Sequence, residues 1–145
     1  MKTSHKIAGL TVMVLALACY VMGGGTGSAA KMNRSTPNVT HIGQGEFTNE
    51  VGLSQQPVVV DFYATWCGPC RVLSPMLEKL APGYTNRIKF VKVNVDESPD
   101  IAQKYQIEGM PTLLFFNKGE VTDRILGLPD EMVLMTKLDS FAAGK

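Results

Sequence analysis

A short strand followed closely by a pair of cysteines constrains the fold of this chain more than any other feature. Val58–Tyr63 is a β-branched and nearly all-apolar run, typical of a strand buried on both faces of a sheet. After a three-residue connection comes Cys67-Gly68-Pro69-Cys70, where a helix is predicted to begin, because the apolar residues that follow recur at helical spacing. These residues are Val72, Leu73, Met76, Leu77 and Leu80. Pro75 should kink this helix, since it lacks an N–H.

The remaining segments predict an α/β domain. Further strands are expected at residues 39–42, 88–95 and 112–116 and at Glu120–Leu126, and further helices at residues 46–53, 98–105 and 130–141. Ser98 is expected to cap its helix, and Asn117-Lys118-Gly119 indicates a tight hairpin turn. The order β-α-β-α-β-α-β-β-α implies a central mixed β-sheet flanked by helices, parallel at first and antiparallel at the final hairpin.

Residues 1–30 have the pattern of a targeting leader. Two lysines precede an apolar stretch at residues 7–22, which is shorter than the roughly 20 residues of a membrane span. Three fates stay open: cleavage after Ala30, lipidation of Cys19 in a lipobox-like run, or retention as a membrane anchor. Each implies export, so a location in the periplasm or cell envelope is expected. Residues 31–38 are predicted to be a linker and residues 39–145 the folded domain.

Composition excludes several classes of function. The net charge is +1, which disfavours binding to nucleic acid or acidic lipid. Three cysteines, two of them close together, do not make the disulfide framework of a small secreted scaffold. The two histidines, His5 and His41, are not spaced to complete a zinc site with the cysteines, so no metal is expected and His41 has no predicted role. A redox pair remains.

The position of Cys67 at a helix start suits thiol–disulfide exchange. The reactive species is the thiolate, and the free N–H groups and positive dipole end of a helix stabilise a negative sulfur. Gly68 permits a close approach, and Pro69 suits a first helical turn. Cys70 lies one turn along, close enough to bond to Cys67. Cys67 would attack a substrate disulfide, and Cys70 would resolve the mixed disulfide.

These motifs resemble the thioredoxin family, over about residues 39–141. The matching residues are Asp61, Trp66-Cys67-Gly68-Pro69-Cys70, Pro75, Lys92, Gly109-Met110-Pro111-Thr112, Gly119 and Gly127. The resemblance implies a thioredoxin fold, a redox disulfide between Cys67 and Cys70, and a cis Pro111 facing it. It also implies that Asp61 accepts a proton from Cys70 and that Lys92 modulates Asp61. A substrate surface is implied at Trp66, Gly68, Pro69, Met110, Pro111 and Gly127.

Simpler interpretations of single residues stay open. Asp61 could be a charge at the end of a strand, and Lys92 an exposed lysine on a strand whose polar and apolar residues alternate. Trp66 and Met110 could be core packing. Tyr63 stands where the commonest thioredoxins carry a second tryptophan, so the local packing should differ.

The function expected from these residues is reduction of protein disulfides. The Gly-Pro pair between the cysteines resembles reducing members of the family. The alternatives are an exported disulfide oxidase or isomerase, and a non-catalytic binding module. No G-x-G-x-x-G loop follows a strand, so no cofactor is expected. The expected partners are disulfide-containing proteins and a thiol electron donor, plausibly a membrane protein. We expect a monomer that binds no nucleic acid.

Overall fold

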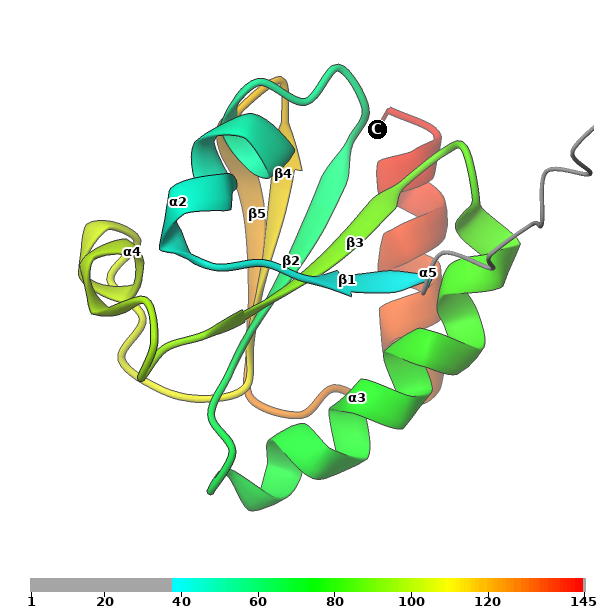
Figure 1. The fold of residues 1–145 in the computed structure, drawn as a ribbon. Helices are drawn as coiled ribbons and strands as arrows, with labels where there is room; N and C mark the ends of the chain where they lie inside the picture. Colours follow the sequence, from blue (N-terminus) through cyan, green and yellow to red (C-terminus); the bar gives the residue numbers. More distant parts are fainter. Residues whose placement is uncertain (1–37, 145) are drawn as a thin grey trace, which may run out of the picture. The chain divides into compact units, whose positions relative to one another are not determined.

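The computed structural model describes residues 38–144, which form a five-stranded mixed sheet with helices on both faces (Figure 1). The strands are β1 (Val39–His41), β2 (Val58–Tyr63), β3 (Lys89–Asn94), β4 (Thr112–Asn117) and β5 (Glu120–Leu126). The helices are α2 (Gln44–Phe47), α3 (Gly68–Leu80), α4 (Pro99–Lys104) and α5 (Glu131–Ala142). A π-helical turn, Thr48–Gly52, continues α2, and a 3₁₀ turn, Ala81–Tyr84, continues α3.

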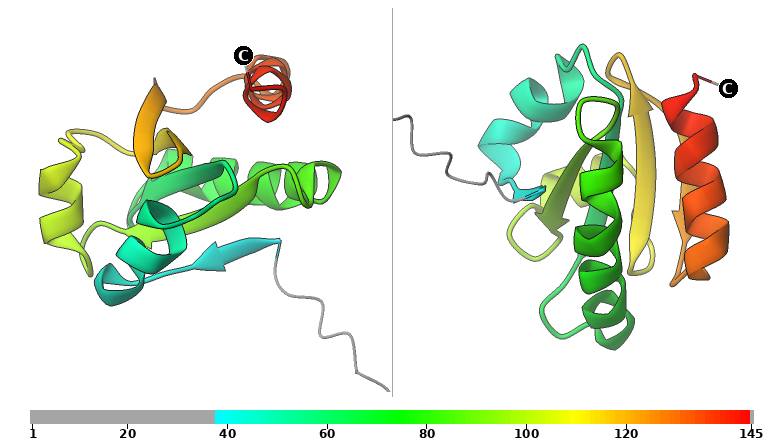
Figure 2. Two further views of the ribbon diagram at one scale, coloured as in Figure 1. Left: turned by 90° about the horizontal axis from the view of Figure 1, so that it is seen from above. Right: turned by 90° about the vertical axis from the view of Figure 1, so that its right-hand side faces the viewer.

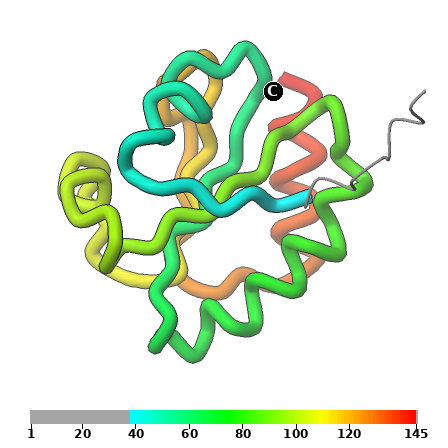
Figure 3. The backbone as a smooth tube through the Cα atoms, viewed as in Figure 1, coloured from blue at the N-terminus to red at the C-terminus, as the bar shows by residue number. Residues whose placement is uncertain are grey.

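The strand order β1-β3-β2-β4-β5 places β2 at the centre of the sheet. Parallel pairing joins β1 to β3 and β3 to β2, and antiparallel pairing joins β2 to β4 and β4 to β5. Figure 3 shows the chain passing from β2 through α3 and returning as β3, the crossover that parallel strands require. The expected fold class and the order of elements are confirmed.

Each face of the sheet has its own apolar core. On one face, Val59 and Phe115 pack with Leu73 of α3 and Leu134 of α5. On the other face, strand residues such as Val60 pack against α2, α4 and the π-helical turn. Figure 2 shows these helices on either side of the sheet. Successive residues of β2 therefore face opposite cores, which explains its nearly continuous apolar run.

The tight turn between β4 and β5 depends on glycine. Lys118 has φ 51° and Gly119 has φ 81°, so both central residues lie in the left-handed region, as a two-residue hairpin of this kind requires. A Cβ atom at position 119 would also collide with the carbonyl oxygen of Gly52. Gly119 thus satisfies two constraints at once.

Four local expectations need correction. The helix expected at 46–53 is α2 followed by the π-helical turn. Ser98 precedes α4 but makes no capping hydrogen bond through its side chain. Val72, expected on the buried face of α3, is 54% exposed. Lys92 and Asn94, expected to alternate with buried residues, are themselves buried, because α3 and neighbouring loops cover this part of β3.

The predicted leader, its cleavage after Ala30, the lipidation of Cys19 and nearly all of the linker lie outside the described residues. Within residues 38–144, no helix is both long and apolar enough to cross a membrane.

Candidate active site

Cys67 and Cys70 lie where the connection from β2 enters α3. Cys67 is the N-cap residue, with an extended backbone, and Pro69 lies in the first turn. The two cysteines form a disulfide, with an S–S distance of 2.07 Å. The backbone N–H of Cys70 donates a hydrogen bond to Sγ of Cys67, at an N···S distance of 3.2 Å. One free N–H group of the first helical turn is thus directed at Sγ of Cys67.

Asp61 is buried on the same face of the sheet as α3. Its side chain is fully buried, and neither carboxylate oxygen has a hydrogen-bond partner among residues 38–144. Burial raises the pKa of Asp61 from 3.8 to about 6, and the positive charge of Lys92 offsets part of that rise. A carboxylate with this pKa can exchange a proton near neutral pH.

Lys92 is the charged neighbour of Asp61. The two residues are register partners on β3 and β2, and Nζ of Lys92 lies 3.9 Å from Oδ2 of Asp61. Lys92 donates a hydrogen bond to Oγ of Ser74, and its Nζ lies 4.8 Å from the centroid of the Tyr63 ring. Only 4% of Lys92 is exposed, so the alternative of an exposed strand lysine is wrong.

A pocket of about 250 Å³ adjoins Lys92 and Cys70, and Asp61 is not among its lining residues. It is lined by Tyr63, Ala64, Thr65, Cys70, Arg71, Ser74, Pro75, Glu78 and Lys92. Several of these groups are polar, and the volume is ample for water. The arrangement can therefore bring solvent to Cys70 on the side where Lys92 lies.

Exposed side chains surround the disulfide on its outer side. Trp66 is 66% exposed, so the alternative that it packs in the core is wrong. Its indole N–H donates to Oδ2 of Asp96 at 3.0 Å, which holds the ring beside the cysteines. Gly68 and Pro69 are exposed as well.

A second loop approaches the cysteines from the start of β4. Met110 is half-buried and packs against the cluster of Ala64, Cys67 and Cys70. The Met110–Pro111 peptide bond is cis, as the resemblance implied. Pro111 is buried, and its carbonyl oxygen accepts a hydrogen bond from the N–H of Gly127 at 2.8 Å. Met110 therefore contacts the cysteine cluster, and the hydrogen bond between Gly127 and Pro111 joins a further expected segment to the Met110 loop.

Sequence reasoning missed several neighbours of this site. Leu126 and Leu128 are 67% and 43% exposed. They place apolar side chains on either side of Gly127, one of the residues expected on the substrate surface. Nδ1 of His41 and the hydroxyl of Tyr63 lie at hydrogen-bond distance, 3.2 Å, a contact that the sequence did not indicate. Ser74 also went unnoticed. Two leucines that flank the glycine of an expected substrate surface could have been noticed in the sequence. The contacts of His41 and Ser74 join different elements, so the sequence alone does not show them.

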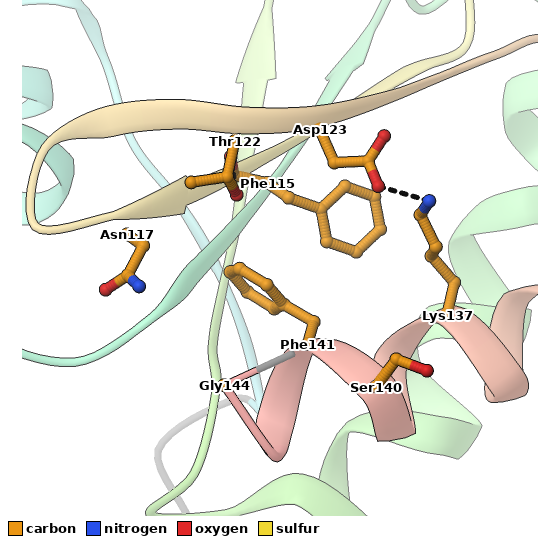
Figure 4. A pocket seen from close by; sticks show the side chains of 8 residues that line it. All are labelled: Phe115, Asn117, Thr122, Asp123, Lys137, Ser140, Phe141 and Gly144. Carbon is orange, nitrogen blue, oxygen red and sulfur yellow. Dashed lines mark hydrogen bonds and ion pairs between the residues drawn. The ribbon is translucent and has the colours of Figure 1, made fainter.

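Other parts of the described chain offer less to chemistry. Residues 38–144 contain no cluster of three or more His, Cys, Asp or Glu side chains that could hold a metal ion. A pocket of about 330 Å³ lies between α5 and the β4–β5 hairpin, crossed by an ion pair of Asp123 with Lys137 (Figure 4). Its lining includes no residue of α3 or of the cysteine loop.

Comparisons with known proteins agree with this geometry. The family model described as Thioredoxin matches residues 38–140. An M-type chloroplast thioredoxin of Pisum sativum is 46% identical over 88 residues, which are 61% of this chain and 51% of that protein. A thioredoxin of Pyropia yezoensis is 39% identical over 104 residues, 72% of this chain and 97% of that protein. Thioredoxin 1 of Synechococcus elongatus is 43% identical over 93 residues, 64% of this chain and 87% of that protein.

The comparisons also bear on length and on the expected location. The chain spans about half the length of the pea relative and of a similar chloroplast protein of Brassica napus. The expected location in the periplasm or cell envelope is wrong, because the similar proteins are thioredoxins of chloroplasts and of cyanobacteria and algae.

Proposed function

The chain belongs to the thioredoxin family, and from that premise we propose that it reduces protein disulfides by dithiol–disulfide exchange at Cys67 and Cys70. The observation that carries the proposal is the hydrogen bond from the Cys70 N–H to Sγ of Cys67 at the start of α3. In the reduced protein the same N–H would face the Cys67 thiolate, and the dipole of α3 would add to its stabilisation.

In the first step the Cys67 thiolate attacks one sulfur of a substrate disulfide. A bond forms between Sγ of Cys67 and that sulfur, the substrate S–S bond breaks, and the other substrate sulfur leaves as a thiolate that takes up a proton. Trp66, Gly68 and Pro69 on one side, and Met110, Pro111 and Gly127 on the other, would hold the substrate chain. Their exposure or packing around the disulfide supports this role.

In the second step Cys70 resolves the mixed disulfide. The Cys70 thiol gives its proton to Asp61 through water, for which the pocket beside Cys70 and Lys92 has room, and the new thiolate attacks Sγ of Cys67. The Cys67–Cys70 bond forms, and the second substrate sulfur leaves and is protonated. Two electrons have then passed from the protein to the substrate. The Cys70 proton returns from Asp61 to the leaving thiolate, and the other proton comes from solvent, because Cys67 reacts as a thiolate. The raised pKa of Asp61 supports its role as acceptor, and Lys92 would modulate it.

The proposed partners follow from this chemistry. Substrates are proteins with accessible disulfides, and a separate thiol electron donor restores the dithiol after each cycle. That the donor is a membrane protein, and that the protein is a monomer, stay predictions. The division into an N-terminal segment 1–30, a linker 31–38 and a catalytic domain 39–145 is part of the same proposal.

Reduction of a protein disulfide, with dithiothreitol as electron source, tests this function. The wild-type protein should accelerate the appearance of substrate thiols, and Cys67→Ser should abolish the acceleration. A reduction potential near the general thioredoxin value of about −270 mV supports a reductase. A potential near about −120 mV, the value of a strong oxidant, would favour the oxidase alternative. A folded wild-type protein without any acceleration would favour the binding module.

A further inference from the structure

The ammonium group of Lys92 lies between two oxygen acceptors on different elements. It donates to Oγ of Ser74 on α3, whereas its distance to Oδ2 of Asp61 is 3.9 Å. An N–H···O hydrogen bond spans about 2.7–3.2 Å, so the contact with Asp61 is Coulombic only. Asp61 correspondingly has no hydrogen-bond partner on either oxygen among residues 38–144.

Ser74 is placed to compete for Lys92 because of its position in α3. It follows Cys70 by four residues, so the two side chains lie on one face of the helix. Cys70, Ser74 and Lys92 line the same pocket of about 250 Å³. A serine hydroxyl is short and neutral, and it can accept a hydrogen bond without adding charge beside Asp61.

We infer that Ser74 is a positioning residue, whose hydroxyl holds the Lys92 ammonium beside α3 and so leaves the Asp61 carboxylate free to take the proton of Cys70. The inference rests on the proposed function, and it deepens the account of how Asp61 is regulated. Within residues 38–144, Asp61 is the one carboxylate within 4 Å of the Lys92 ammonium, so Lys92 would turn to it without the hydroxyl. A shift of about 1 Å would turn their 3.9 Å contact into a direct hydrogen bond.

Other charged and titratable groups face this pair from several elements. The Tyr63 ring of β2 packs against the ammonium, and its hydroxyl lies by Nδ1 of His41 on β1. Arg71 and Glu78 of α3 line the pocket, and Glu97, which precedes α4, acts on Tyr63. Among the charges, Lys92 is the one that lowers the pKa of Asp61. Moving Lys92 closer should therefore have the dominant effect.

The test is the pKa of Asp61, measured by carbon NMR of its carboxyl group in the full-length oxidised protein. Ser74→Ala should lower that pKa by about one pH unit, because an opposite charge that forms a hydrogen bond favours the ionised form. Ser74→Thr keeps a hydroxyl and should restore the wild-type value. The matched control is Ser140→Ala on the exposed face of α5, which should leave the value unchanged.

Exchange kinetics separate this inference from the proposed function. In Ser74→Ala, Asp61 would be a weaker base, so Cys70 should resolve the mixed disulfide severalfold more slowly at neutral pH. The pH profile of this step should be displaced to lower pH. An unchanged or raised pKa of Asp61 in folded Ser74→Ala overturns the inference, even where Asp61→Asn slows exchange. A lowered pKa of Asp61 in Ser74→Ala supports the inference that Ser74 positions Lys92. If Asp61→Asn then leaves the exchange rate unaffected, it is the role of Asp61 as proton acceptor that fails.

Discussion

Asp61 on β2 and Lys92 on β3 are register partners, and their charged atoms lie 3.9 Å apart in the layer between the sheet and α3. Both side chains are buried, and Lys92 lines a pocket that Cys70 also lines. Burial raises the pKa of Asp61 to about 6 despite this positive neighbour. The site thus carries a carboxylate whose protonation changes near pH 6, close to neutral pH.

The two cysteines should titrate differently in the reduced protein. Both cysteines are buried, but Cys67 is the N-cap of α3 and accepts a hydrogen bond from the Cys70 N–H, whereas Cys70 lies within the first turn. The pKa of Cys67 should therefore lie well below that of a free thiol, and the pKa of Cys70 above it. Alkylation rates against pH, with the modified residue identified by mass spectrometry, measure both. Equal reactivity of the two sulfurs would contradict the assignment of Cys67 as the nucleophile.

Asp61→Asn should stabilise the oxidised protein in a pH-dependent way. Because the folded pKa of about 6 exceeds the ordinary value of 3.8, the folded state binds more protons between these values. The wild-type protein therefore loses stability as pH rises from about 4 to 6, with the full loss above 6. The rise in the pKa of Asp61 from 3.8 to about 6 corresponds to about 3 kcal/mol of lost stability at high pH. The gain from Asp61→Asn should be smaller than this, because the buried amide also loses solvation.

Chemical denaturation at pH 4 and pH 8 checks this expectation. The stability of Asp61→Asn should exceed that of the wild type at pH 8, and the difference should shrink at pH 4. Glu108→Gln, at an exposed position, serves as the control and should show little pH-dependent difference. A wild type that is as stable as Asp61→Asn at pH 8 would contradict the raised pKa.

Trp66→Ala should weaken substrate binding with little loss of stability. The ring is 66% exposed, so its removal opens no cavity, and it is expected to contact the substrate chain. The KM for a protein disulfide should rise severalfold, while alkylation of Cys67 stays nearly normal. Leu53→Ala removes a side chain that is 65% exposed directly after the π-helical turn and should leave KM unchanged. An equal KM for both variants would remove Trp66 from the substrate surface.

Cys70→Ser should trap partners on Cys67. Without the resolving thiol, the mixed disulfide formed in the first step cannot be released by the second. Trapped complexes should be visible on non-reducing gels and should disappear with dithiothreitol. Cys67→Ser, the matched variant, should trap none. Equal trapping by both variants would mean that Cys70 is a nucleophile in its own right.

Gly119→Ala should destabilise the fold without touching the site. An alanine there must adopt φ 81° and place its Cβ against the Gly52 carbonyl oxygen, so a loss of about 2 kcal/mol or more is expected. Gly45→Ala is the control, because a Cβ at position 45 meets no atom within 4 Å. Thermal unfolding measures both variants. Similar melting temperatures would show that the turn relaxes.

Much of the fold could be predicted because its signals are local. The bounds of β2 and β5 match the expected ones, since each strand has a distinct run of residue types that ends at turn residues. The position of Cys67 at the start of α3 is equally local. It requires only a strand, a short connection and a helix with proline in its first turn.

The amino-acid sequence by itself determined the order of elements and the position of the cysteine pair at a helix start. Tertiary structure alone decided that Lys92 is buried, that it donates to Ser74, and that neither Asp61 oxygen accepts a hydrogen bond from residues 38–144. These contacts join residues 18 and 31 positions apart in the chain, because the parallel pairing of β2 with β3 and the crossing of α3 bring them together. The burial of a side chain depends on which elements pack over it, and the alternation of residue types along a single strand does not show which elements those are.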